Sequence, residues 1–184
     1  MGTGPVHDRA MSLIRPPDAL ETDRLVLRHR RVDEADIFRR LWTERDERVP
    51  AHRRIDAQGR PTVDEIAAQI RAEGPGLRLL AVERKDSGDV IGYCGLTARG
   101  DGPPDEPELA YELLRAAHGS GYATEAGRAV VAWATESGIL RLWAGVWDWN
   151  VASRRVLAKL GFRETGRVER TSVHGQSLLT VRES

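Results

Sequence analysis

The chain has 184 residues, and 28 lysine and arginine residues balance 28 aspartate and glutamate residues, so the formal net charge at pH 7 is zero. This length favours a single domain with a sizeable core, and the balanced charge argues against nucleic acid or an anionic membrane surface as a partner. The single cysteine, Cys94, excludes an internal disulfide and fits the cytoplasm, which is a reducing compartment.

The N-terminal segment, residues 1–20, lacks the apolar core of a signal peptide. No apolar run in the chain reaches the length that a membrane-spanning helix needs. We therefore expect a cytoplasmic protein in which residues 1–20 form a mobile leader and residues 21–184 form one domain.

Apolar residues at helical spacing predict a first helix over residues 35–42. A second helix begins at a capping box formed by Thr62 and Glu65, and its apolar positions repeat at i, i+3, i+4 and i+7. Between these helices lies a polar loop, residues 45–61, whose arginines we interpret as solvated side chains, with contact to an acidic acceptor as the alternative. The predicted strands lie at residues 24–28, 79–83, 89–96, 108–114, 141–147, 163–170 and 178–181.

The strand over residues 141–147 is apolar on both faces, which is typical of a central strand covered on both sides. A third helix follows residue 121, and a fourth covers residues 151–160 and ends at Gly161, a predicted C-cap. The order β-α-α-β-β-β-α-β-α-β-β describes a single α+β domain, or mixed α/β sandwich.

The third helix is entered through His118-Gly119-Ser120-Gly121. Glycine costs roughly 0.5–1 kcal/mol relative to alanine near a helix, so either a special backbone angle or a ligand against the main chain should compensate. The segment lacks the third glycine of a dinucleotide fingerprint and the lysine of a nucleotide-phosphate loop. A purely structural turn and a turn that binds the diphosphate of coenzyme A both remain open at this point.

The wider segment "ELAYELLRAAHGSGYATEA", residues 108–126, resembles the acetyl-CoA-binding segment of the GNAT acetyltransferases. The similarity is to the ribosomal-protein N-acetyltransferase (RimJ/RimL-like) branch. Three further segments resemble the same branch in the same order: "ETDRLVLR" at 21–28, "VIGYCGL" at 90–96 and "NVASRRVLAKLGFRETG" at 150–166. The resemblance implies a GNAT-like acyl-CoA N-acyltransferase fold, with a mostly antiparallel, twisted mixed sheet flanked by helices and splayed fourth and fifth strands.

The resemblance also implies a site for acetyl-CoA as co-substrate, without a metal. The main chain of the glycine turn and the helix start would hold the diphosphate, through His118, Gly119, Ser120, Gly121, Tyr122, Ala123 and Thr124. A backbone N–H near Leu113 or Leu114 would hold the thioester carbonyl. Asn150 would contact the pantetheine arm, and Ser153 would protonate the leaving sulfur. The alternative for Asn150 and Ser153 is purely structural, as the N-cap and first turn of a helix.

The general base is the residue that the sequence does not supply, because the glutamate of some relatives, six residues after Gly166, is Ser172 here. Glu108 is the first candidate for the catalytic base, followed by Glu112, Glu169 and His174. For each of them the alternative is a solvated surface side chain without a catalytic role. Without a base, an acceptor amine of low pKa is favoured over lysine.

We expect an N-acetyltransferase that transfers acetyl from acetyl-CoA to a primary amine, with a protein N-terminal α-amine preferred. The alternatives are a small-molecule amine acetyltransferase, for an antibiotic or a metabolite, and a non-catalytic acyl-CoA-binding regulator. Neither nucleic acid nor membrane is expected as a partner, and the resemblance leaves a homodimer open.

Overall fold

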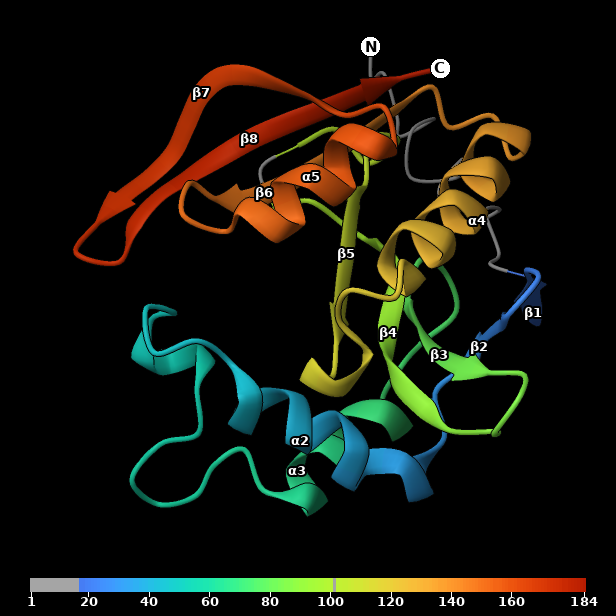
Figure 1. Ribbon diagram of the computed structural model, residues 1–184, viewed down its shortest axis with the longest axis vertical. Helices are drawn as coiled ribbons and strands as arrows, with labels where there is room; N and C mark the ends of the chain where they lie inside the picture. The colour runs from blue at the N-terminus through green and yellow to red at the C-terminus, as the bar shows by residue number, and fades with distance from the viewer. Residues whose placement is uncertain (1–16, 101) are drawn as a thin grey trace, which may run out of the picture.

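The computed structural model describes residues 17–100 and 102–184, and one mixed sheet runs through these residues (Figure 1). Within them the strands are β1 (Ala19–Glu21), β2 (Leu25–His29), β3 (Leu79–Arg84), β4 (Val90–Thr97), β5 (Glu108–Leu113), β6 (Arg141–Trp147), β7 (Arg163–Ser172) and β8 (Gly175–Glu183). Their spatial order is β1-β2-β3-β4-β5-β6-β8-β7. Every neighbouring pair is antiparallel except β5 and β6, which are parallel.

The sheet splits between β5 and β6. These two strands share one ladder pair, Glu108 with Trp143, whereas β5 stays paired with β4 along its length and β6 stays paired with β8. Just beyond that pair the Gly145 N–H donates to the carboxylate of Glu108 at 3.1 Å instead of to a β5 carbonyl. The strands that correspond to the fourth and fifth predicted strands are therefore splayed, as expected.

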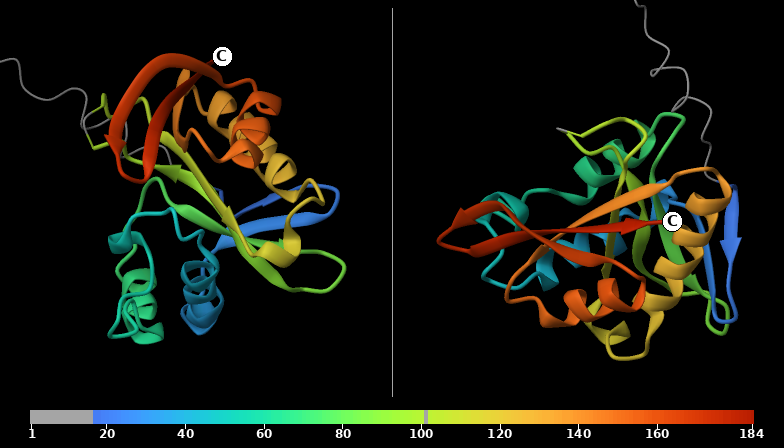
Figure 2. Two further views of the ribbon diagram at one scale, coloured as in Figure 1. Left: turned by 60° about the vertical axis from the view of Figure 1, so that its left-hand side comes forward. Right: turned by 90° about the horizontal axis from the view of Figure 1, so that it is seen from above.

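Helices cover both faces of the sheet (Figure 2). The helical segments are η1 (Val32–Glu34), α2 (Ala35–Glu44), η2 (Ala51–Arg53), α3 (Val63–Arg71), η3 (Arg115–Ala117), α4 (Tyr122–Glu136) and α5 (Val151–Lys159). On one face α2 and α3 pack through Phe38 and Ile66 onto a small core that includes Ala81. On the other face α4 and α5 cover the larger core, to which they contribute Val130 and Leu157. The mixed α/β sandwich is thus confirmed.

Local hydrogen bonds mark the helix ends that the sequence predicts. At the start of α3 the Thr62 hydroxyl accepts from the Glu65 N–H at 3.2 Å, and the Glu65 carboxylate accepts from the Thr62 N–H at 2.8 Å. At the end of α5, Gly161 has a φ of +85°, the left-handed conformation of a C-cap glycine. The capping box and the C-cap are both confirmed.

Two features differ from the prediction. Most of the expected leader, residues 1–20, lies outside the described residues, but Ala19 and Leu20 belong to β1, which pairs with β2 and which the apolar pattern did not reveal. The prediction that residues 141–147 are covered on both faces is wrong. Leu142, Ala144 and Val146 are buried, but the opposite face is not, because α2 packs on β4, across the split from β6.

Gly95 of β4 lies close to the backbone at the start of β3. A Cβ at Gly95 would lie 2.2 Å from the carbonyl oxygen of Arg78 and 2.9 Å from the Cα of Leu79, and neither backbone atom can move without disturbing the sheet. Gly95→Ala should therefore lower the free energy of unfolding by about 2 kcal/mol. Gly100→Ala is the matched control, because a Cβ there would meet nothing within 4 Å. Urea unfolding compares the two variants, and equal midpoints would contradict the prediction.

Candidate active site

A cleft of about 1000 Å³ opens where β5 and β6 part. Its walls come from the end of α2 and the loop after it, the end of β5, the glycine turn with the start of α4, the end of β6, and α5. Of the predicted site residues, the cleft is lined by Leu113, His118, Gly119, Gly121, Tyr122, Ala123, Thr124, Asn150 and Ser153. Glu108, Leu114 and Ser120 are not among the lining residues.

The glycine turn adopts the special backbone conformation that its composition suggests. Gly119 has a φ of +77° and Gly121 a φ of +83°, in the left-handed region that side chains disfavour. Gly121 is the N-cap of α4 and has no side-chain cap, and the first helical bond runs from the Glu125 N–H to the Gly121 carbonyl. The N–H groups of the first turn therefore face the cleft without helical partners, and together with the positive end of the helix dipole they suit an anion.

The end of β5 distinguishes between the two predicted carbonyl-binding residues. The Leu114 N–H donates to the Ile91 carbonyl of β4 at 2.8 Å, so that group is already used. Hydrogen-bonding directions alternate along an antiparallel strand, so the N–H of Leu113 points away from β4, toward the split. Leu113 is thus the residue whose N–H can donate into the cleft.

Ser153 on α5 contacts Tyr111 on β5 across the split. The Tyr111 hydroxyl lies 2.7 Å from the Ser153 Oγ and donates to the Ser153 carbonyl at 3.1 Å. Burial raises the pKa of Tyr111 to about 12, although the bond to Ser153 favours the ionised form. The Tyr111 hydroxyl therefore stays protonated near neutral pH. Asn150 accepts the Ser153 N–H at 3.1 Å, so it is an N-cap as well as a cleft residue.

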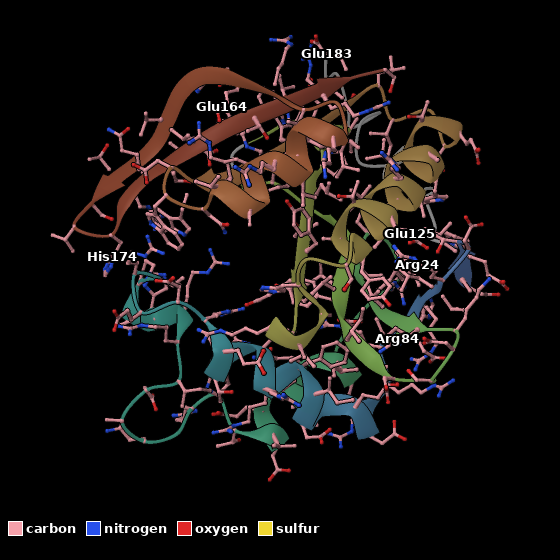
Figure 3. All side chains as sticks on the ribbon, viewed as in Figure 1. Arg24, Arg84, Glu125, Glu164, His174 and Glu183 are labelled. Atoms are coloured by element: carbon pink, nitrogen blue, oxygen red, sulfur yellow. The ribbon has the colours of Figure 1, made fainter. Side chains whose placement is uncertain are left out.

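The candidate bases occupy different places. Glu108 joins β5 to β6 through the Gly145 N–H, which is a structural role outside the cleft lining. Glu169 is paired with Arg99 at 3.1 Å. His174 lies at the outer turn between β7 and β8, where its carbonyl accepts from the indole of Trp149 (Figure 3).

The carboxylates that do line the cleft are all ion-paired. Arg45 donates to both oxygens of Glu112, at 2.7 and 2.6 Å, and the Tyr93 hydroxyl donates to the same carboxylate at 2.9 Å. A hydrogen bond from the side chain of Arg48 holds the pKa of Asp46 far below its usual range. Burial alone would raise the pKa of Glu44, but its hydrogen bonds from Arg115 and Arg40 and their charges outweigh this and lower it.

One side of the cleft carries an aromatic wall. Trp147 and Trp149 stack with ring centroids 6.2 Å apart and planes 9° apart, and the Arg48 guanidinium lies 4.1 Å from the Trp149 ring centroid. The interpretation of the loop arginines as solvated is wrong for Arg45, whose side chain is only 9% exposed. Tyr111 could have been found from the sequence, because it shares strand parity with Leu113.

Other chemistry is sparse in the described part of the chain. Within residues 17–100 and 102–184, no three His, Cys, Asp or Glu side chains gather closely enough to hold a metal ion. None of the helices there is both long enough and apolar enough to cross a membrane. Cys94 is fully buried in the sheet, and burial raises the pKa of its thiol to about 12.

Comparison with known proteins identifies the family. The acetyltransferase (GNAT) domain family matches residues 24–163. A protein of Bacillus subtilis (strain 168), described as the uncharacterized N-acetyltransferase YoaA, is 30% identical over 154 residues, which cover 80% of this chain and 84% of that protein.

Solved structures share the fold. A GNAT-family acetyltransferase from Bacillus anthracis superposes with a TM-score of 0.72 at 16% identity and covers 90% of this chain and 98% of its own. Mycobacterium smegmatis RimJ in complex with CoA-disulfide superposes with a TM-score of 0.66 at 22% identity and covers 87% and 82%. The chain belongs to the GNAT acetyltransferase family and is an acetyltransferase.

Proposed function

We propose that this protein transfers the acetyl group of acetyl-CoA to a primary amine of low pKa, with the α-amine of a peptide or protein N-terminus as the preferred acceptor. The observation that carries the proposal is one continuous cleft, which joins the amides of the glycine turn to the Tyr111–Ser153 pair across the split sheet. The solved RimJ neighbour, which contains a coenzyme A derivative, supports the same cofactor here.

The residues present fit coenzyme A. The N–H groups at the start of α4 would receive its diphosphate, and Arg155 and Lys159 of α5 add positive charge to the lining. The bound thioester supplies the acetyl group. The Leu113 N–H would donate to the carbonyl oxygen as it becomes negative, and Asn150 would lie along the pantetheine arm.

Ser153 would act as the general acid. The amine nitrogen forms a bond to the acetyl carbon, the carbon–sulfur bond breaks, and the Ser153 hydroxyl gives its proton to the sulfur. The Tyr111 hydroxyl, 2.7 Å from the serine oxygen, would turn its proton from the Ser153 carbonyl to that oxygen as the serine loses its own proton. The acetylated nitrogen loses its extra proton to water, and the serine oxygen takes a proton back from water, so the serine is restored and charge and atoms balance.

The acceptor class follows from the state of the cleft carboxylates. Hydrogen bonds from arginine lower the pKa of Glu44 and of Asp46, which makes these two carboxylates weak bases. Both oxygens of Glu112 already accept hydrogen bonds from Arg45, and one also accepts from Tyr93. Deprotonating an amine at pH 7 costs about 4.6 kcal/mol for lysine and only about 1 to 1.4 kcal/mol for an α-amine. A site whose carboxylates are all occupied by arginine therefore favours an acceptor that is already partly neutral.

An amine panel tests this function. We expect kcat/KM at pH 7 to be on the order of 300-fold higher for a lysine-free peptide with a free N-terminus than for an N-terminally blocked peptide with one lysine. Below the pKa of the acceptor, the rate should rise about tenfold per pH unit, because the amine itself must lose the proton. Aminoglycosides and polyamines complete the panel as small-molecule acceptors. Faster acetylation of the lysine peptide would contradict the proposed acceptor class.

A further inference from the structure

Within the glycine turn one side chain anchors the backbone: the His118 ring lies 2.9 Å from the Leu113 carbonyl of β5. His118, Gly119, Ser120 and Gly121 are all exposed, and two glycines in four residues make the segment intrinsically flexible. Binding an anion through main-chain amides requires those amides to keep a fixed direction. Something outside the turn must therefore hold the residues that follow His118.

Arg24, at the entry to β2, contacts three successive parts of this region. Its Nη1 donates to the carbonyl of Ser120 at 3.1 Å, its guanidinium lies 4.5 Å from the Tyr122 ring centroid, and its Nε donates to the Glu125 carboxylate at 2.7 Å. Figure 3 shows Arg24 and Glu125 next to each other, close to the start of α4.

The bond to Ser120 determines the orientation of a peptide group. In a trans peptide the carbonyl and the next N–H point in opposite directions. Because Arg24 holds the Ser120 carbonyl, the N–H of Gly121 points away from Arg24, and Gly121 lines the cleft. This contact thus keeps one donor of the turn directed away from the outer surface.

Arg24 also neutralises the negative charge of Glu125, which lies near the proposed diphosphate site. A carboxylate in the first turn of α4 competes for the same free N–H groups and repels an incoming phosphate. Here its two oxygens are turned toward β2, where they accept from Arg24 and from the Thr22 hydroxyl at 2.6 Å. The negative charge is therefore both paired and held on the far side of the turn.

We infer that Arg24 is a positioning residue for the diphosphate of coenzyme A: it holds the glycine turn in its binding conformation and neutralises Glu125 beside it. This inference rests on the proposed function. It assigns a role to the "ETDRLVLR" segment, in which Arg24 contacts the turn and Thr22 contacts Glu125. Neither of these two residues lines the cleft.

Calorimetry with coenzyme A on the purified protein tests the inference. Arg24→Met, which keeps the apolar stem, is expected to bind coenzyme A roughly tenfold more weakly than the wild type. The same loss is expected for 3′-dephospho-coenzyme A, which retains the diphosphate. Glu125→Gln alone should bind within twofold of the wild type, and adding it to Arg24→Met should recover about half of the lost affinity on a logarithmic scale.

Arg84→Met is the matched control. Arg84 also lies over the Tyr122 ring, at 5.8 Å, but its ion-pair partner is Asp86 on the hairpin and not a group of the turn. It should bind coenzyme A like the wild type. Should Arg24→Met not fold, Arg24→Lys takes its place with a smaller expected loss.

The outcomes separate the two proposals. Failure of the wild type to bind coenzyme A overturns the proposed function. A wild type that binds, with Arg24→Met equal to it, overturns the role of Arg24 alone. A loss that disappears with 3′-dephospho-coenzyme A, or a double variant no tighter than Arg24→Met, also overturns that role.

Discussion

Gly121→Val is expected to weaken the binding of coenzyme A about a hundredfold, because the left-handed conformation costs an L-residue about 1–2 kcal/mol and a β-branched one more. Gly121 has a φ of +83°, and a Cβ there would lie 3.6 Å from a guanidinium nitrogen of Arg24. The chain would relieve the strain by moving the turn, and its amides would lose their direction. Calorimetry with coenzyme A measures the effect.

Gly138→Val is the matched control for that substitution. Gly138 follows the other end of α4, has a φ of +81°, and would place its Cβ in open space. Both variants should lose similar folding stability, but only Gly121→Val should lose affinity. Equal coenzyme A affinities in the two variants would mean that the turn does not hold the cofactor.

Ser153→Ala is expected to lower kcat about a hundredfold, which is the lower range for general acid catalysis. Its dissociation constant for acetyl-CoA should stay within twofold of the wild type, because the hydroxyl acts on sulfur as the bond breaks. The substitution keeps the Ser153 N–H that Asn150 accepts, so the start of α5 is preserved. Thiol release gives kcat, and calorimetry gives the dissociation constant.

Two further variants make the role of Ser153 specific. Ser153→Thr keeps a hydroxyl and should retain most of the activity. Tyr111→Phe removes the group 2.7 Å from the serine oxygen and should lower kcat by a smaller factor, with thermal stability reported alongside. Full activity of Ser153→Ala would show that another group, or water, protonates the sulfur.

The helix ends and the glycine turn were predictable because their contacts are local. Thr62 and Glu65 are three residues apart, and the cap at Asn150 is satisfied by the N–H of Ser153, also three residues on. Glycine near a helix lowers stability unless the backbone needs a conformation that other residues disfavour, so the glycines indicated a positive φ such as that of Gly121. Such features depend on neighbours along the chain, which a sequence displays directly.

The covered faces were less predictable. Apolar residues on both sides of 141–147 suggested a strand buried on both faces, but where the sheet splits one side of β6 borders an opening. An apolar side chain can be buried or exposed, so its hydrophobicity does not show whether a helix packs over that face of the strand. The same limit applies to β1, whose three residues carry too short a pattern to recognise.

By itself the sequence determined the order of the elements, the caps of α3 and α5, the glycine turn at residues 119–121 and the membership of the GNAT family. Only the tertiary structure decided that Arg45 pairs with Glu112, 67 positions away, that Tyr111 meets Ser153, 42 positions away, and that Arg24 meets Glu125, 101 positions away. Arg24 meets Glu125 because β2 lies beside α4, and Tyr111 meets Ser153 because β5 parts from β6. Arg45 reaches Glu112 because α2, which packs on β4, ends close to β5. Long-range contacts of this kind depend on how whole layers pack, and no local pattern of residues records that.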